Sequence, residues 1–370
     1  MTLAGTAVLA LACGHTEPFS APPYGSTQPF DPTPPIRLTL NPAADRGASW
    51  LPDGSGILYS AQQLGRADAD VCLAELPPGG GSQRRLICGL AAPDAELTNA
   101  IESPAATASG RLAFLRASSS IGGTSPSGTA VVVAPALDPA IAAEVQRLPY
   151  TIPGEPPHGA VTALRWLDET RLVFVGGSMA YRTECQLCQV DTIGTGLKVV
   201  VLDVPPSGPA PVALSGTDFA SSVSPGATAD EIYFTVGGDG RVFRRLVSSG
   251  QTSVAHDFGA AGIARDVHVA GGRLVATVGG RVTFSVDSTL GLTQWDSGGI
   301  VHVVDLASGA GVALSAPGML RRPVLAPAGD RVVTEGYPLI LQSAFDPVTN
   351  IRRVDTTVSR AGDLYLFTTP

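Results

Sequence analysis

The stretch from Ser49 to Ser60 constrains the fold of this chain more than any other part of the sequence. It has the pattern of a short strand, a tight turn and a second strand. Pro52 presets φ for a turn, and Asp53 and Gly54 readily adopt turn geometry. The apolar run Ile57–Tyr59 then resumes a strand. Two short strands joined this closely predict an antiparallel hairpin.

Weaker copies of this hairpin recur along the chain. In each copy, a polar or glycine-rich turn precedes a short apolar strand, which we call the second strand of the repeat. The second strands are predicted to begin at Ile57, Leu112, Leu172, Ile232, Leu274 and Val332. Their mean spacing is about 55 residues. A period of roughly 40–50 residues with four strands is typical of a β-propeller blade, and loop insertions lengthen it.

The remaining strands follow the same repeat. Third strands are predicted at Val71–Leu76, Thr129–Leu137, Leu197–Val204, Arg241–Val247, Ile300–Leu306 and Asp363–Phe367. Fourth strands are predicted at Arg84–Cys88, Glu144–Pro149, Pro211–Leu214, Thr252–Ala255 and Gly311–Leu314. The sixth repeat lacks a fourth strand, whereas Ile36–Leu40 is strand-like and precedes the first repeat. We therefore predict an all-β chain in which residues 36–370 form a single six-bladed β-propeller, closed by Ile36–Leu40.

The segment Trp50-Leu51-Pro52-Asp53-Gly54 resembles the Trp-Ser-Pro-Asp-Gly repeat of TolB-like bacterial propeller proteins. The resemblance covers about residues 36–370. It is strong in the first repeat, fair in the sixth at Leu325–Asp330, and weak elsewhere. It implies the six-bladed propeller of TolB.

The composition narrows the classes of partner. The chain has 24 Lys and Arg residues against 32 Asp and Glu residues, which gives a net charge of −8. No run of basic residues is present. Nucleic-acid binding requires clustered Lys and Arg, so we expect no nucleic-acid partner.

The first 13 residues are predicted to be an export segment. Leu3–Ala12 is apolar and small, and the sequence around Cys13 resembles a bacterial lipobox, in which the cysteine becomes the lipidated first residue of the mature protein. Two features depart from that pattern: no Lys or Arg precedes the run, and Ala10 stands where Leu or Val is usual. The alternative is an uncleaved tail with a free Cys13. The apolar run is about half the roughly 20 residues that a spanning helix needs.

Residues 14–35 are predicted to be a linker. Seven prolines fall within these 22 residues, so the segment prefers extended polyproline geometry over strand pairing. At about 3.1 Å per residue it reaches roughly 70 Å. We expect it to tether the propeller to a lipid on Cys13, at the periplasmic side of a bacterial membrane.

The other four cysteines are predicted to form two disulfides. If Leu76 lies opposite Arg84 in the hairpin of the first blade, then Cys72 lies opposite Cys88, and an oxidising periplasm favours the bond. Cys185 and Cys188 could close a small loop. A redox site or a zinc site at this pair is the weaker alternative, because a thioredoxin-like context and two further zinc ligands are missing.

Long segments separate the second and third strands in five of the six repeats. They comprise residues 62–70, 118–128, 178–196, 279–299 and 337–361, whereas the turns at the opposite face are short. Long loops on a rigid scaffold are often functional, and interfaces are enriched in aromatic residues and Arg. The predicted partner-binding residues are Tyr181, Arg182, Trp295, Leu339, Ile340, Phe345, Arg352 and Arg353. The alternative is that these side chains pack on their own propeller as a lid.

No catalytic motif stands out in the sequence. There is no Gly-x-Ser-x-Gly motif, and Val236–Gly240 reads as a hairpin turn rather than a phosphate-binding loop. Asp68, Asp70, Glu184 and Asp191 could converge on a metal in the central channel, but scattered solvated carboxylates are favoured. We expect a non-catalytic scaffold without cofactor or metal, an extrinsic subunit of a membrane complex such as a Tol-type, transport, respiratory or photosynthetic assembly. The alternative is a propeller enzyme such as a metal-dependent hydrolase or lactonase.

Overall fold

A computed structural model describes most of the chain from residue 35 onward. The described residues are 35–39, 44–62, 71–80, 83–88, 97–120, 128–149, 160–182, 191–204, 211–279, 282–287, 291–295, 299–315, 320–337, 339–346, 351–358 and 362–370. They form β-strands and two 3-10 turns, η1 (Pro139–Ile141) and η2 (Gly259–Ala261). The predicted export segment, and the predicted linker up to residue 34, lie outside these ranges.

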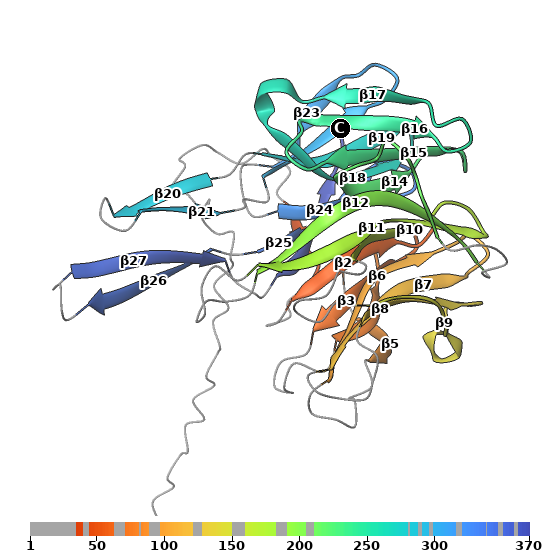
Figure 1. The fold of residues 1–370 in the computed structure, drawn as a ribbon, viewed down its shortest axis with the longest axis horizontal. Coiled ribbons are helices and arrows are strands. Elements are labelled where there is room, and N and C mark those ends of the chain that lie inside the picture. The colour runs from red at the N-terminus through yellow and green to blue at the C-terminus, as the bar shows by residue number, and fades with distance from the viewer. Residues whose placement is uncertain are drawn as a thin grey trace, which may run out of the picture.

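The strands build a six-bladed β-propeller of four-stranded antiparallel sheets (Figure 1). Blade 1 contains β2 (Asp45–Trp50), β3 (Ile57–Gln62), β4 (Val71–Leu76) and β5 (Arg84–Cys88). Blade 2 contains β6 (Leu97–Ala106), β7 (Leu112–Ser120), β8 (Gly128–Ala134) and β9 (Ala143–Pro149). Blade 3 contains β10 (Ala160–Trp166), β11 (Arg171–Arg182), β12 (Asp191–Asp203) and β13 (Val212–Ala213).

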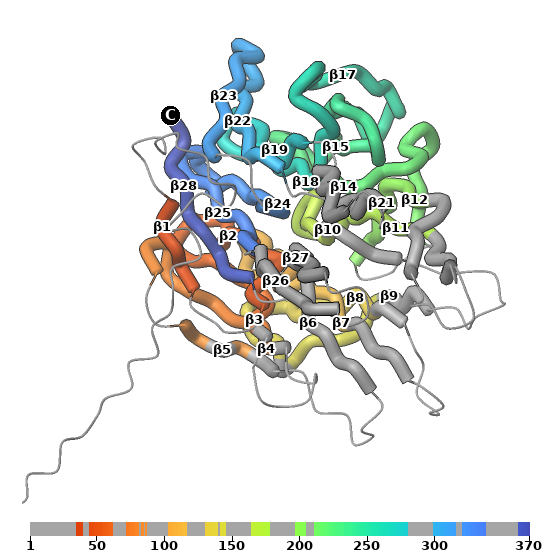
Figure 2. Tube along the Cα trace, turned by 90° about the vertical axis from the view of Figure 1, so that its left-hand side faces the viewer, coloured from red at the N-terminus to blue at the C-terminus, as the bar shows by residue number. Residues whose placement is uncertain are grey.

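The second half of the chain continues the ring. Blade 4 contains β14 (Ala220–Pro225), β15 (Glu231–Val236), β16 (Arg241–Leu246) and β17 (Thr252–Asp257). Blade 5 contains β18 (Ile263–Ala270), β19 (Arg273–Gly279), β22 (Ile300–Asp305) and β23 (Gly311–Ala313). Blade 6 contains β24 (Leu320–Leu325), β25 (Arg331–Gly336), β28 (Asp363–Thr368) and β1 (Ile36–Arg37). The first strand of each blade lies near the centre of the ring (Figure 2).

Blade 6 combines both ends of the propeller sequence. β1 pairs antiparallel with β28, with Ile36 opposite Leu366. Just beyond β1, the Leu38 N–H donates to the Leu364 carbonyl at 2.8 Å. Arg37 forms an ion pair with Asp363 at 2.7 Å. The N-terminal strand therefore lies beside the C-terminal strand, as the fourth strand of that sheet.

The described residues form a core of six hydrophobic clusters, one between each pair of neighbouring blades. The second strands contribute to the clusters on both of their faces. In β3, Ile57 and Tyr59 pack against blade 6, while Leu58 packs against blade 2. This is why the second strands are continuous apolar runs rather than alternating ones, and why sequence alone located all six of them.

In several blades, an arginine directly before the apolar residues of the second strand donates a hydrogen bond to the next blade. Arg171 Nη2 donates to the Ala229 carbonyl of blade 4 at 3.0 Å, and Arg273 Nη1 donates to the Gly329 carbonyl of blade 6 at 3.2 Å. Arg111 reaches the Glu169 carbonyl of blade 3 in the same way. Charged donors to carbonyls therefore fasten the short turns of neighbouring blades to one another.

The first strand of every blade carries a bulge. The register against the second strand shifts once in each of the six pairs. In four blades the bulge contains a residue with left-handed φ: Gly47 (63°), Ser103 (50°), Asp266 (50°) and Arg322 (48°). Bulges redirect the side chains that follow them, here near the centre of the ring.

The long segments of blades 5 and 6 contain strands, where the sequence predicted loops. β20 (Val282–Asp287) pairs with β21 (Gly291–Trp295), and β26 (Leu339–Asp346) pairs with β27 (Ile351–Val358). In blade 3, β11 and β12 likewise extend the blade as far as the pair Arg182 and Asp191. Figure 1 shows the two separate hairpins projecting from one side of the ring.

Candidate functional site

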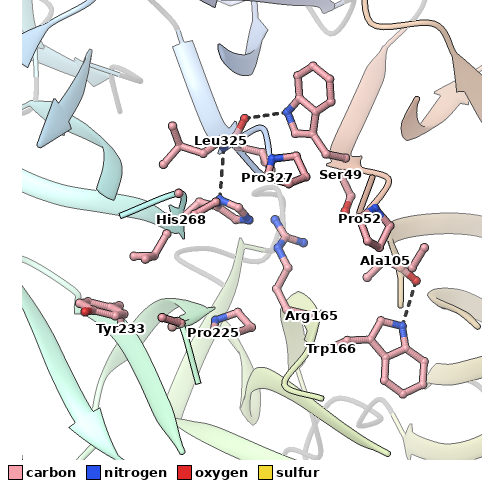
Figure 3. A pocket seen from close by; sticks show the side chains of 18 of the residues that line it. Ser49, Pro52, Ala105, Arg165, Trp166, Pro225, Tyr233, His268, Leu325 and Pro327 are labelled. Carbon is pink, nitrogen blue, oxygen red and sulfur yellow. Dashed lines mark hydrogen bonds between the residues drawn. The ribbon is translucent and has the colours of Figure 1, made fainter. Parts of the chain in front are cut away.

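A cavity of about 680 Å³ opens at the centre of the ring. Its walls come from the ends of the first strands and from the short turns that follow them (Figure 3). Each of the six blades contributes to the lining. One lining residue from each blade, in order from blade 1 to blade 6, is Trp50, Ala105, Arg165, Pro225, His268 and Leu325. The cavity therefore lies at the face of the short turns, opposite the face on which the sequence placed the binding residues.

Two tryptophans hold the wall of the cavity together. Trp50 Nε1–H of blade 1 donates to the Val324 carbonyl of blade 6, and Trp166 Nε1–H of blade 3 donates to the Ala105 carbonyl of blade 2, both at 3.1 Å. The Arg331 guanidinium lies 4.8 Å from the centre of the Trp50 ring. Each indole thus joins the first strands of two blades and presents its ring as an apolar surface.

Arg165 extends into the cavity from the end of β10 (Figure 3). Its Nη1 donates to the Leu164 carbonyl at 2.8 Å, while its Nε is buried without a hydrogen-bond partner. Burial and the nearby charge of Arg322 lower the pKa of Arg165 to about 10, although Asp266 and Glu335 act in the opposite direction. The guanidinium is therefore charged at neutral pH and incompletely compensated.

His268 faces Arg165 from the end of β18 (Figure 3). Its Nδ1 accepts the Leu325 N–H at 3.2 Å, so a neutral ring carries its proton on Nε2. Burial, followed by the charge of Arg165, lowers the pKa of His268 to about 3. At neutral pH the cavity therefore contains one cation and one neutral N–H donor that point toward each other.

A second polar group connects blades 5, 6 and 1. Glu335 is fully buried, and its carboxylate accepts the Gly47 N–H at 2.6 Å and the Tyr337 hydroxyl at 2.6 Å. Arg322 Nη1 approaches the same carboxylate at 3.4 Å, while the Arg322 N–H donates to Asp266 at 3.1 Å. Burial and the Glu335 charge raise the pKa of Tyr337, which keeps its hydroxyl protonated as a donor.

The predicted partner-binding residues lie on paired strands away from this cavity. Phe345 is opposite Arg352 in the ladder of β26 and β27, and Trp295 is opposite Val282 in that of β20 and β21. Tyr181 and Arg182 lie at the far end of β11, and Leu339, Ile340 and Arg353 lie in β26 or β27. The structure describes the backbone of these residues but not their side chains.

The structure describes only some of the predicted cysteine and acidic site residues. Cys72 lies opposite Cys88 in the ladder of β4 and β5, as predicted, but the register that led to this prediction was wrong. Glu75 rather than Leu76 lies opposite Arg84, and a bulge between Leu73 and Ala74 brings the two cysteines opposite each other. Asp191 begins β12. Six other predicted residues lie outside the described ranges: Cys13, Asp68, Asp70, Glu184, Cys185 and Cys188.

Arg165 and His268 are the site residues that sequence reasoning missed. A signal was present in the repeat, because Arg165 in Leu164–Leu167 stands where the first repeat has Ser49 and the second has Ala105. A charged residue at a position where other blades have small ones points to the channel. His268 occupies the same position in blade 5.

Over the described part of the chain, no helix is long and apolar enough to cross a membrane. No group of three or more His, Cys, Asp or Glu side chains in the same residues is arranged to hold a metal ion.

The chain has no match among protein-family models, and no curated protein is similar to it in sequence. Among solved structures, a gluconolactonase from Xanthomonas campestris is 15% identical with a TM-score of 0.51, over 93% of this chain and 99% of that one. TolB from Acinetobacter baumannii is 13% identical with a TM-score of 0.48 and covers 85% of this chain, which spans 64% of TolB. An oligogalacturonate lyase from Vibrio parahaemolyticus is 9% identical with a TM-score of 0.44, over 90% of this chain and 80% of that one. At these identities the likeness is one of fold, a β-propeller.

Proposed function

We propose that this protein is a non-catalytic propeller scaffold on the periplasmic side of a bacterial membrane, tethered by a lipid on Cys13. It docks on a membrane or envelope protein complex through the hairpins that project from one side of the ring. The observation that carries this proposal is the unequal length of the connections. Second and third strands are joined through β20–β21, β26–β27 and the extended β11–β12, whereas at the opposite face the third and fourth strands of blades 4 and 5 are joined by the short turns 247–251 and 306–310.

The projecting hairpins have the properties of a docking element. Each of the sheets β20–β21 and β26–β27 has two strands and pairs with no third strand within the described residues, although β20 and β27 approach each other. An open strand edge presents unpaired N–H and C=O groups that another chain can pair with. A two-stranded hairpin is marginally stable alone in water, and a partner that covers it adds stability. Trp295 and Phe345 in these hairpins are of the types that dominate binding energy at interfaces.

The lipid tether strengthens such docking without a large interface. Anchoring confines the propeller near membrane partners and raises its effective concentration there. A modest contact made by the hairpins then suffices. The Pro-rich residues 14–35 give the extended reach that this geometry needs.

Pull-down of the full chain from its native host in mild detergent tests the docking. We expect wild type to capture a membrane complex, and Trp295→Ala and Phe345→Ala to weaken capture roughly thirtyfold, which corresponds to about 2 kcal/mol at an interface anchor. Val312→Ala, on the outer strand β23, is the matched control and should bind normally. If both aromatic variants bind like wild type, or if both unfold, the hairpins are a lid on this propeller and the docking proposal fails.

Fractionation tests the anchor separately. Wild type is expected in the membrane fraction and Cys13→Ala in the soluble fraction. Mass spectrometry that finds an intact Met1 and an unmodified Cys13 would rule out the lipid. The alternative function, a metal-dependent hydrolase or lactonase, predicts instead that purified protein retains a divalent metal through dialysis.

A further inference from the structure

We propose that the central cavity is a binding site for a small organic carboxylate, held by the Arg165 guanidinium and by the Nε2–H of His268. This site is separate from the projecting hairpins. It goes beyond the docking function, since it would give the scaffold a small-molecule ligand at the opposite face of the ring.

The first argument is the spare hydrogen-bonding capacity of Arg165. Among the described residues its one hydrogen bond goes to the adjacent Leu164 carbonyl, and its buried Nε has no hydrogen-bond partner there. No ion pair involves Arg165 within the described part of the chain. A buried charge without a partner is costly, and such groups are normally paired. An anion in the cavity would supply a counter-charge for the guanidinium.

The second argument is that the nearby carboxylates are already engaged. Glu335 accepts from Gly47 N–H, from the Tyr337 hydroxyl and from Arg322. Asp266 accepts the Arg322 N–H at 3.1 Å. Among the described residues neither forms a hydrogen bond with Arg165, so both carboxylates compensate this cation only through space and only in part.

The third argument is the arrangement of the donors. The Leu325 N–H fixes the His268 ring through Nδ1, which leaves Nε2–H directed toward the Arg165 side of the cavity (Figure 3). A carboxylate has two oxygens that can accept from a guanidinium and from a further donor. A cation and a neutral donor together suit a monoanion.

The walls select an organic ligand over an inorganic ion. Trp50, Trp166, Pro52 and Pro327 line the cavity, and both indole N–H groups are already bonded to backbone carbonyls. These rings therefore offer apolar surface rather than donors. A volume of about 680 Å³ lies within the usual range for small-molecule sites, roughly 300–1,000 Å³.

The test uses the full chain and compares sodium benzoate with its neutral analogue benzamide at constant ionic strength. We expect benzoate to raise the Tm in a concentration-dependent manner and benzamide to leave it unchanged. Arg165→Met should abolish the benzoate effect. Arg165→Lys, which keeps the charge but loses the planar fork, should weaken affinity about tenfold or more. Arg84→Met, on the outer strand of blade 1, is the matched control and should respond like wild type.

A structural role and a binding role for Arg165 predict different Tm values for the ligand-free Arg165→Met variant. If Arg165 serves binding, Arg165→Met removes an uncompensated charge, and its Tm without ligand should equal or exceed that of wild type. A lower Tm would mean that Arg165 stabilises the fold, and it would count against the proposal. A crystal soaked with 4-bromobenzoate provides a check without a variant, since the bromine signal should lie in the central cavity.

Four further results would each overturn the proposal. They are equal effects of benzoate and benzamide, unchanged benzoate binding by Arg165→Met, a bromine signal elsewhere, and tighter binding of inorganic phosphate than of benzoate. The outcome is independent of membrane capture. Failure here leaves the docking function intact, and loss of capture by the hairpin variants leaves this site intact.

Discussion

The indole Nε1–H of Trp50 in blade 1 donates to the Val324 carbonyl in blade 6 at 3.1 Å, across 274 residues of sequence. The bond is buried and lies where the first and last blades meet. Trp166 makes the same bond to Ala105 between blades 3 and 2. The same indole-to-carbonyl hydrogen bond therefore occurs both between neighbouring blades within the ring and where the first and last blades meet.

Replacing Trp50 by Phe should destabilise the propeller. The ring is retained in part, but the buried Val324 carbonyl loses its donor, which costs about 1–3 kcal/mol of unfolding free energy. Urea unfolding measures this directly. Trp166→Phe should act in the same direction, whereas Val312→Ala, at a position that is 42% exposed, should stay within about 0.5 kcal/mol of wild type. Unchanged stability of Trp50→Phe would show that the bond contributes nothing at the joint.

Deleting the N-terminal strand should destabilise the whole ring. Removal of residues up to Leu40 takes away the Arg37 ion pair with Asp363, the Thr39 hydroxyl that receives the Leu364 N–H at 2.9 Å, and the buried Leu38. Asp363 is 5% exposed, and loss of a partner from a buried ion pair costs about 3 kcal/mol or more.

Deletion only up to Phe30 is the control for that truncation and should leave the Tm nearly unchanged. It keeps every described contact of β1. Thermal unfolding followed by circular dichroism compares the two proteins. Equal Tm values would contradict the idea that β1 stabilises the ring.

Free-thiol counting should find no reactive cysteine in the mature protein besides Cys13. The ladder places Cys72 opposite Cys88, a pairing compatible with a cross-strand disulfide, and we predict a second bond between Cys185 and Cys188. The count is made by alkylation in denaturant without reductant, with reduced protein as the control. Two or more alkylated thiols in freshly purified protein would show that at least one of these bonds is absent.

The blade pattern was predictable from sequence because the second strands are buried on both faces. Ile57, Tyr59 and Leu58 form a continuous apolar run, and such runs repeat at blade spacing. The hairpins β20–β21 and β26–β27 were missed as strands, because the sequence interpretation treated these segments only as insertions between blades. The pattern of polar and apolar residues in these segments does not recur in the other repeats at the spacing of the blades.

The pairing of Arg165 with His268 in the channel could not be predicted, since it depends on tertiary convergence. Comparison of the repeats marks each as an unusual residue at its position, but the two are 103 positions apart in the sequence. Only the closed ring brings the ends of β10 and β18 to one cavity. The bulges in the first strands, which redirect these side chains, also interrupt the regular alternation that sequence analysis relies on.

His268 should make the protein less stable as the pH falls from about 6.5 toward 5. Its pKa is lowered to about 3 by burial and then by Arg165, while the unfolded chain has the ordinary histidine value near 6.5. Above pH 6.5 both states are neutral and His268 contributes nothing. Between these two pKa values the unfolded state binds a proton that the folded state does not, so the unfolding free energy decreases with falling pH.

The size of the effect can be measured by urea unfolding at pH 7, 6 and 5. One such proton costs at most about 1.4 kcal/mol per pH unit, which gives about 1–2 kcal/mol between pH 6.5 and 5. His268→Gln keeps a neutral acceptor for the Leu325 N–H and should flatten the profile over this range. Carboxylates with lowered pKa, such as Asp168, titrate at lower pH and contribute little here. Burial also lowers the pKa of His256, so His256→Gln, on the outer strand β17, should remove part of the slope, but less than His268→Gln because His256 is only partly buried. An identical slope for His268→Gln and wild type would show that His268 takes up a proton in the folded protein at an ordinary pH, and that the cavity is more hydrated than its burial implies.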